Sequence, residues 1–312
     1  MRRILSIDGG GIKGVFPGSF LATLEQSLGQ PIATYFDLIV GTSTGGIIAL
    51  GLGLGISARD VLSFYEENGP SIFRGSRAAR ALRQIGISKY NSNPLREALR
   101  TVFGDRKLGE SARRLVVPSC NLDTGEVHIW KTSHHPRLER DYVASVVEVA
   151  LSTAAAPTYF PTHRSSAGIP LVDGGMWANN PVGIALVEAT GILEWPRDSL
   201  RVLSLGCTTT PLSTGVLRNR ALGWLFWRMK VTEVLMAAQS SGALGMATHL
   251  IGDRNNLVRI SPTVSEAFTL DNVREIRSLK GLGDSEARKA LPSLRPLFFA
   301  HPADEFVPHH HV

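Results

Sequence analysis

The sequence predicts an α/β protein with three layers, in which helices cover both faces of a mostly parallel central sheet. Two observations lead to this prediction. Apolar strand-like runs alternate with helix-like segments from the first residues onward, as in β-α-β units. In addition, three glycine-rich motifs each follow a strand-like run, which is where open α/β sheets build their sites. A chain of 312 residues can bury a large core without disulfides or metals.

The first half of the chain supplies most of the predicted sheet. A short buried strand over residues 3–8 precedes an amphipathic helix over residues 14–28, and a second strand ends at Val40. A helix of small residues then covers 43–54. The next predicted elements are a helix from Ala58 capped by Ser57, a basic helix at 74–89, a helix opened by Asn93-Pro94, strands at 114–119 and 126–131, and a helix at 143–155 that Pro157 stops.

The pattern changes after residue 206. A strand at 171–172, a helix at 182–189 and a strand at 200–205 complete the predicted sheet. Beyond them, residues 222–250 predict one or two long apolar helices, and the polar tail contains further helical pieces. We therefore expect a core over residues 1–206 and a helical C-terminal section over residues 207–312 that packs on the same domain.

Composition and charge argue against several classes of protein. The formal charge is +6, but no dense run of Lys and Arg broken by aromatics is present, so no nucleic-acid polymer is expected as partner. Cys120 and Cys207 form no spaced pair, and we expect neither a metal nor a cofactor. The N-terminal apolar run is too short for a secretory signal, and residues 45–56 are too short to span a bilayer. A cytoplasmic protein is the resulting expectation.

The first motif, DGGGIKG, spans residues 8–14 and follows the first strand. Adjacent glycines ahead of a helix leave backbone N–H groups bare, and the helix dipole adds to their preference for negative charge. The glycines also match a dinucleotide fingerprint, but the second strand runs into a serine motif instead of ending in the acidic residue that holds a ribose. Val15 stands where a P-loop requires lysine. The motif therefore predicts a site for negative charge without a nucleotide fold.

The second motif, Gly41-Thr42-Ser43-Thr44-Gly45, is a G-x-S-x-G sequence between an apolar strand and a small-residue helix. In this context serine projects from a sharp strand-to-helix turn, and the small flanking residues allow the backbone to crowd. A glycine-rich turn whose serine only caps the helix is the alternative interpretation. The third motif, Asp173-Gly174-Gly175, follows a strand-like run and is by itself more typical of a turn.

Serine and aspartate together predict an acyl hydrolase. A serine hydroxyl is a weak nucleophile and needs a base within hydrogen-bond reach. If Asp173 takes the proton directly, its pKa must be raised by partial desolvation to be useful near neutral pH. His249 and His301 both follow Asp173, so a Ser-Asp-His order as in α/β-hydrolases also stays open.

These motifs resemble those of the patatin-like phospholipase family, and the similarity extends to IATYFDLIV (32–40), LSTAAAPTYFP (151–161) and DGGMWANNP (173–181). It covers about residues 1–206. The resemblance implies Ser43 as nucleophile and Asp173 as base of a catalytic dyad. It implies an oxyanion hole formed by the amides of Gly9, Gly10, Gly11 and Ile12. Further motif positions that match are Lys13, Gly14, Gly41, Gly45, Gly174 and Gly175.

The resemblance implies cleavage of fatty-acyl esters of membrane phospholipids through an acyl-enzyme, with the protein peripheral at the inner membrane when active. The wording FYEENGPSIF (64–73) and KTSHHPRLERDY (131–142) is similar to antiphage phospholipase effectors that a cyclic dinucleotide switches on. A cyclic dinucleotide activator is therefore an expectation, and a homo-oligomer is compatible with the resemblance.

Two other functions stay open. The same residues would serve a general esterase or thioesterase, and a binding module could keep the fold without activity. Trp224 and Trp227 lie beside basic residues in LGWLFWRMK (222–230), which suits either contact with a membrane interface or completion of the core.

Overall fold

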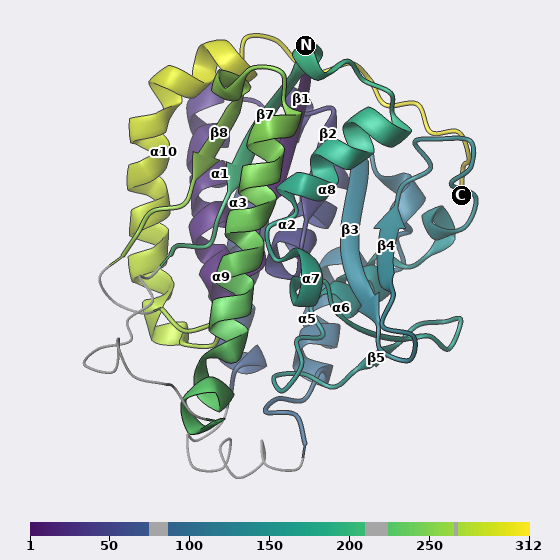
Figure 1. Ribbon diagram of the computed structural model, residues 1–312, viewed down its shortest axis with the longest axis vertical. Helices are drawn as coiled ribbons and strands as arrows, with labels where there is room; N and C mark the ends of the chain where they lie inside the picture. The colour runs from purple at the N-terminus through teal and green to yellow at the C-terminus, as the bar shows by residue number, and fades with distance from the viewer. Residues whose placement is uncertain (75–86, 210–223, 265–267) are drawn as a thin grey trace.

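The computed structural model describes residues 1–74, 87–209, 224–264 and 268–312 (Figure 1). Its centre is an eight-stranded sheet of order β5-β6-β3-β2-β1-β7-β8, with β4 paired to β3. The strands are β1 (Arg2–Ile7), β2 (Leu38–Gly41), β3 (Arg114–Asn121), β4 (Val127–Lys131), β5 (His163–Arg164), β6 (Pro170–Asp173), β7 (Leu200–Leu205) and β8 (Leu257–Ile260). The sheet is mixed, because β4, β5 and β6 form antiparallel pairs while the other pairings are parallel.

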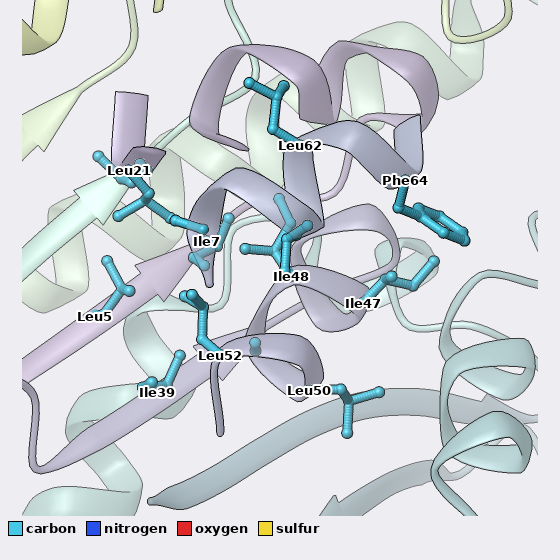
Figure 2. Close-up of a cluster of buried hydrophobic side chains, with 14 of the residues drawn as sticks. Leu5, Ile7, Leu21, Ile39, Ile47, Ile48, Leu50, Leu52, Leu62 and Phe64 are labelled. Atoms are coloured by element: carbon cyan, nitrogen blue, oxygen red, sulfur yellow. The ribbon is translucent and has the colours of Figure 1, made fainter. Parts of the chain in front are cut away.

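Alternating side chains of the central strands divide the core into two layers. Leu5 and Ile7 of β1 point into one cluster, whereas Ile4 points into the other. In β2, Ile39 joins the first cluster and Leu38 the second. This period of two is the signature of a strand that is buried on both faces. Figure 2 shows part of the first cluster, where strand side chains meet those of the covering helices.

Helices cover both faces of the sheet, as the sequence predicts (Figure 1). One face packs against α1 (Val15–Leu28), α2 (Thr44–Gly53), α3 (Ala58–Ile72), α5 (Asn93–Phe103), α6 (Val146–Thr153) and α10 (Ile276–Phe298). The other packs against α7 (Gly175–Ala178), α8 (Val182–Val187) and α9 (Trp224–Leu250). Short turns are η1 (Gly11–Gly14), η2 (Ile32–Tyr35), η3 (Leu108–Glu110), η4 (Asp141–Val143), the π-turn η5 (Glu188–Ile192), η6 (Arg197–Ser199), η8 (Arg254–Asn256) and η9 (Val273–Glu275).

The C-terminal section contains the long helices α9 and α10, as the sequence predicts, and in addition one strand. Its β8 extends the sheet in parallel beside β7, with Val202 opposite Leu257. The tail after α10 then runs back over the sheet, where Ala303 N donates to Thr34 O at 2.8 Å and His309 N to Ser133 O at 2.8 Å. The section therefore shares one sheet and one core with the preceding residues. Most of the predicted basic helix at 74–89 lies outside the described residues.

Candidate active site

Ser43 lies at the sharp turn between β2 and α2. Its backbone has φ 54° and ψ −120°, a conformation that residues other than glycine rarely adopt. A Cβ atom at Gly41 would overlap the carbonyl of Gly45, and one at Gly45 would overlap the carbonyl of Ile7. Glycine is thus required on both sides of the serine, because the turn is packed backbone against backbone. The strained turn exposes the hydroxyl at the carboxyl end of the sheet.

Asp173 ends β6, opposite Ser119 of β3. Its side chain is almost fully buried, with 5 % of the residue exposed. Burial raises the pKa of Asp173 to about 6, although the hydrogen bond from Gly175 N and the nearby Ser43 hydroxyl lower it. The Gly175 N–Asp173 Oδ1 distance is 2.7 Å. The structure therefore brings together two side chains that lie 130 positions apart in the sequence (173 − 43).

Thr153, the last residue of the final turn of α6, and Ala155, just after it, bind the backbone of Ser43 and of Asp173. Ser43 N donates to Thr153 Oγ1 at 2.9 Å, and Thr153 Oγ1 donates to the carbonyl of Pro118 on β3 at 2.6 Å. Two residues later, the carbonyl of Ala155 accepts from Asp173 N at 3.0 Å. Thr153 is completely buried. This turn therefore sets the position of the nucleophile turn relative to the aspartate.

We expect a Thr153→Val variant to lose about 1–3 kcal/mol of unfolding free energy, because it leaves the Ser43 amide and the Pro118 carbonyl unpaired in the interior. Thr153→Ser keeps the hydroxyl and serves as the matched control. Urea unfolding measures the difference, and esterase kcat should fall in the Val variant only. A loss in Thr153→Ser without a loss in Thr153→Val would show that the methyl group, not the hydroxyl, matters.

The glycine loop offers fewer bare amides than the sequence predicts. Gly9 N donates to Asn179 O at 2.9 Å, and Ile12 N donates to Leu270 O at 2.8 Å. For the amides of Gly10 and Gly11, no acceptor is found among the described residues. Of the four predicted amides, the two at the middle of the loop are thus available to an oxyanion in this structure.

A buried ion pair holds the first residue of the glycine motif in place. Asp8, the first residue of the motif, accepts from Arg259 of β8 through both carboxylate oxygens, at 2.8 and 2.5 Å. Burial raises the pKa of Asp8, and the attraction of Arg259 opposes this rise. Lys13 also lowers the pKa of Asp8 through its charge. Below the loop, a Cβ on Gly10 would overlap Cys207.

The other motif glycines are placed at close contacts. Gly14 faces Thr44, and Gly174 faces the carbonyl of Pro118. The two histidines that left a triad open are remote from Asp173. The carbonyl of His301 accepts a hydrogen bond from Arg3 at the start of β1, and His249 is exposed near the end of α9. Within the described ranges, the pKa of Asp173 responds to burial, Gly175 and Ser43 and to no histidine.

Other expectations are tested only in part. The side chains of Trp224 and Trp227 lie outside the described part of the chain, so their membrane contact stays a prediction. Among the described residues, no cluster of three or more His, Cys, Asp or Glu side chains could hold a metal ion. No helix in the described ranges is long and apolar enough to cross a membrane.

Several contributing residues carried no signal that sequence reasoning used. Thr153 stands inside the recognised segment LSTAAAPTYFP, so its position could have been noticed but not its bond to Ser43. Arg259 lies in a short strand of the C-terminal section, 251 positions from Asp8. The site as a whole combines a strained serine, a buried carboxylate with a raised pKa and bare amides. Such an arrangement can perform acyl transfer through serine.

Comparison with known proteins identifies similar sequences. The family described as "Patatin-like phospholipase" matches residues 5–186. The chain is 36 % identical to a "cGAMP-activated phospholipase" of Pseudomonas aeruginosa (strain BWHPSA011 / Pa011), over 98 % of this chain and 94 % of that protein. It is 32 % identical to a protein of the same name from Vibrio cholerae, over 97 % and 96 % of the two chains. The crystal structure of VipD from Legionella pneumophila aligns with a TM-score of 0.48 and 12 % identity, covering 94 % of this chain and 67 % of that chain.

Proposed function

The chain belongs to the patatin-like phospholipase family, and from this premise we propose that Ser43 and Asp173 form the catalytic dyad of a phospholipase. The enzyme is a lipid acyl hydrolase. One observation supports the assignment of the dyad above all others. A serine in a strained turn lies near enough to a buried aspartate for its hydroxyl to lower the pKa of that carboxyl, which burial raises to about 6, beside the glycine loop.

In the proposed reaction, Ser43 Oγ attacks the ester carbonyl carbon while Asp173 takes the hydroxyl proton. The amides of Gly10 and Gly11 hold the negative oxygen, a role in which loss of one donor typically costs about 3 kcal/mol of barrier. Collapse expels the lysophospholipid alkoxide, which receives the proton from Asp173. Asp173 then deprotonates a water that attacks the acyl carbon. When the bond between that carbon and Ser43 Oγ breaks, Asp173 returns the proton to Oγ, which releases the fatty acid and regenerates both residues.

A base with a pKa near 6 suits this chemistry. It is ionised in most molecules at neutral pH, yet it binds a proton far more readily than an ordinary aspartate. The hydrogen bond from Gly175 N orients the carboxylate, and the nearby Ser43 hydroxyl favours its charged form without neutralising it. The arrangement therefore needs no histidine to pass the proton.

We also propose that a cyclic dinucleotide activates the enzyme, which then acts from the cytoplasm on phospholipids of the inner membrane. The support is that two relatives covering nearly the whole chain carry the name cGAMP-activated phospholipase. An activator that shifts a protein between two states must bind one of them more tightly than the other. The proposal therefore requires a state with low activity in the absence of the ligand.

The test is lipid mass spectrometry after incubation of the protein with phospholipid vesicles, with and without 3′,3′-cGAMP. We expect lysophospholipid and free fatty acid to appear with cGAMP and to vanish after pretreatment with a fluorophosphonate that labels Ser43. Parallel assays with an acyl-CoA and a short-chain ester distinguish a thioesterase or general esterase. Faster cleavage of those substrates than of phospholipid would contradict the proposed substrate class, and activity unchanged by cGAMP would contradict the proposed activator.

A further inference from the structure

Residues 268–272, which lead into α10, lie against the proposed oxyanion site. The carbonyl of Leu270 accepts from Ile12 N at 2.8 Å. Gly11 has φ +57°, and a Cβ there would overlap the same carbonyl, so the contact depends on glycine at this position. A chain carbonyl thus binds the Ile12 amide and lies against Gly11, next to the Gly10 and Gly11 amides that we propose to polarise the ester carbonyl.

The next residue, Asp271, is held by a cation and a hydroxyl. Its carboxylate lies 2.5 Å from Lys89 Nζ and 2.5 Å from the Tyr90 hydroxyl. Both members of the ion pair are mostly buried, with side chains 18 % exposed for Lys89 and 10 % for Asp271. Charge-assisted bonds of this kind are stronger than neutral ones, more so when water is largely excluded.

Lys89 and Tyr90 pair with residues 158–159, in the segment whose Ala155 binds Asp173. Lys89 N donates to Thr158 O and Tyr90 N to Tyr159 O, both at 2.8 Å. Thr158 follows the α6 turn, whose Ala155 carbonyl binds the Asp173 amide. The Lys89 ammonium also lies 4.9 Å from the centre of the Tyr159 ring. Residues 155–159 therefore bind the lysine and the tyrosine on one side and the amide of the proposed base on the other.

Consecutive residues thus present a carbonyl to the glycine loop and an anion to a lysine and a tyrosine. A phospholipid carries the same two groups, an ester carbonyl and a phosphodiester anion, a few bonds apart. We propose that Leu270–Asp271 is an internal mimic of the substrate and that Lys89 with the Tyr90 hydroxyl forms the subsite for the substrate phosphodiester. This inference rests on the proposed function and adds a headgroup site and an off state to it.

The two halves of the proposal have separable consequences. While Asp271 occupies Lys89, a substrate phosphate must displace it, so the present arrangement has low activity. Neutralising Asp271 weakens the hold of the segment, so that Leu270 can move away from Gly11 and any ester can approach the glycine loop. Removing the charge of Lys89 also weakens that hold, but it removes the phosphate subsite at the same time. Substrates with and without phosphate therefore respond differently to the two changes.

The experiment compares kcat/KM for dioctanoyl phosphatidylglycerol and dioctanoylglycerol without activator. Asp271→Asn should raise both rates about tenfold, the ratio expected for loss of one hydrogen bond to a charged group. Lys89→Met should raise the diacylglycerol rate but lower the ratio of phospholipid to diacylglycerol hydrolysis about tenfold. Lys280→Met, which breaks the Lys280–Glu66 pair at 2.6 Å between α10 and α3, is the matched control and should change neither.

Unchanged or reduced rates in Asp271→Asn overturn the internal mimic, and an unchanged ratio in Lys89→Met overturns the phosphate subsite. If Lys89→Met fails to fold, Tyr90→Phe supplies the second variant and should lower the ratio as well. Labelling of Ser43 by a neutral fluorophosphonate needs no turnover and should be about tenfold faster in Asp271→Asn. An equal labelling rate would also overturn the mimic.

Two further measurements are needed. One distinguishes the phosphate of a lipid from the phosphate of cGAMP as the ligand of Lys89, and the other distinguishes failure of the subsite from failure of the proposed function. The cGAMP concentration for half-maximal activity should be the same for Lys89→Arg as for the unaltered protein. A large increase in Lys89→Met with an unchanged substrate ratio would assign the lysine to the activator and overturn the lipid subsite. Absence of any Ser43-dependent hydrolysis would contradict the proposed function, whereas Ser43-dependent turnover with an unchanged ratio contradicts only the subsite.

Discussion

Replacing Ser43 with Ala is expected to lower kcat for ester cleavage by about 10⁴-fold or more, because the nucleophile is removed and no acyl-enzyme can form. Asp173→Asn keeps the shape of the side chain but removes the base, and the expected loss is about 10²–10⁴-fold. Single-turnover assays on a phospholipid measure both. The double variant should be no slower than the worse single variant, since the two groups act as one unit. Additive losses would contradict a dyad.

Because the pKa of Asp173 is raised, kcat/KM should depend on pH in a characteristic way. Because the base must be ionised, kcat/KM should rise about tenfold per pH unit below pH 6 and level off above it. In Asp173→Asn the residual activity should lack this step. A profile that breaks near pH 7 and persists in the variant would instead indicate a histidine.

The same shift has a consequence for stability. The pKa of Asp173 is higher in the folded state than in the unfolded chain, so ionisation opposes folding. This penalty grows as the pH rises from about 4 to 6 and amounts to about 3 kcal/mol at most above that window. Asp173→Asn should therefore have a higher Tm than the unaltered protein at pH 7.5, and the difference should disappear near pH 4. If Asp173→Asn is inactive but more stable, its loss of activity comes from the missing base and not from unfolding.

The Arg259→Met variant is expected to lose about 3–5 kcal/mol of unfolding free energy at pH 7.5, because it leaves the buried Asp8 carboxylate without its partner. Asp8 Oδ1 and Oδ2 each accept from one Arg259 nitrogen, so the arginine partners both carboxylate oxygens. Urea unfolding measures the loss. The destabilisation should shrink as the pH falls, because Asp8 then becomes neutral by protonation.

The double variant Asp8→Asn with Arg259→Met separates the pair from the packing. It removes the unpaired charge and should recover much of the stability lost in Arg259→Met. Arg288→Met is the surface control, since its pair with Asp284 is exposed and should contribute about 0–1 kcal/mol. A double variant as unstable as Arg259→Met would mean that the contacts of the arginine chain, and not the charge of Asp8, support the glycine loop.

Local signals in the sequence predicted the helices and strands of the core with small shifts. The strand predicted to end at Val40 ends at Gly41, and the helix predicted over 143–155 spans Val146–Thr153. These elements carry their own information, because each has a regular apolar period and a glycine or proline at its end. In contrast, β8 at Leu257–Ile260 is short, and no residue is fully buried in it, so no strong period marks it. Its pairing with β7 is a tertiary event.

The motifs also identified the family and proposed the chemically active residues, because a serine turn, an aspartate turn and a glycine loop each need particular side chains locally. Only the tertiary structure decided which groups lie together. It placed Asp173 beside Ser43 and raised its pKa by burial, and it left Gly10 and Gly11 bare while pairing the amides of Gly9 and Ile12. Burial, long-range hydrogen bonds and charge pairs depend on chain segments far apart in sequence, and no local pattern encodes them.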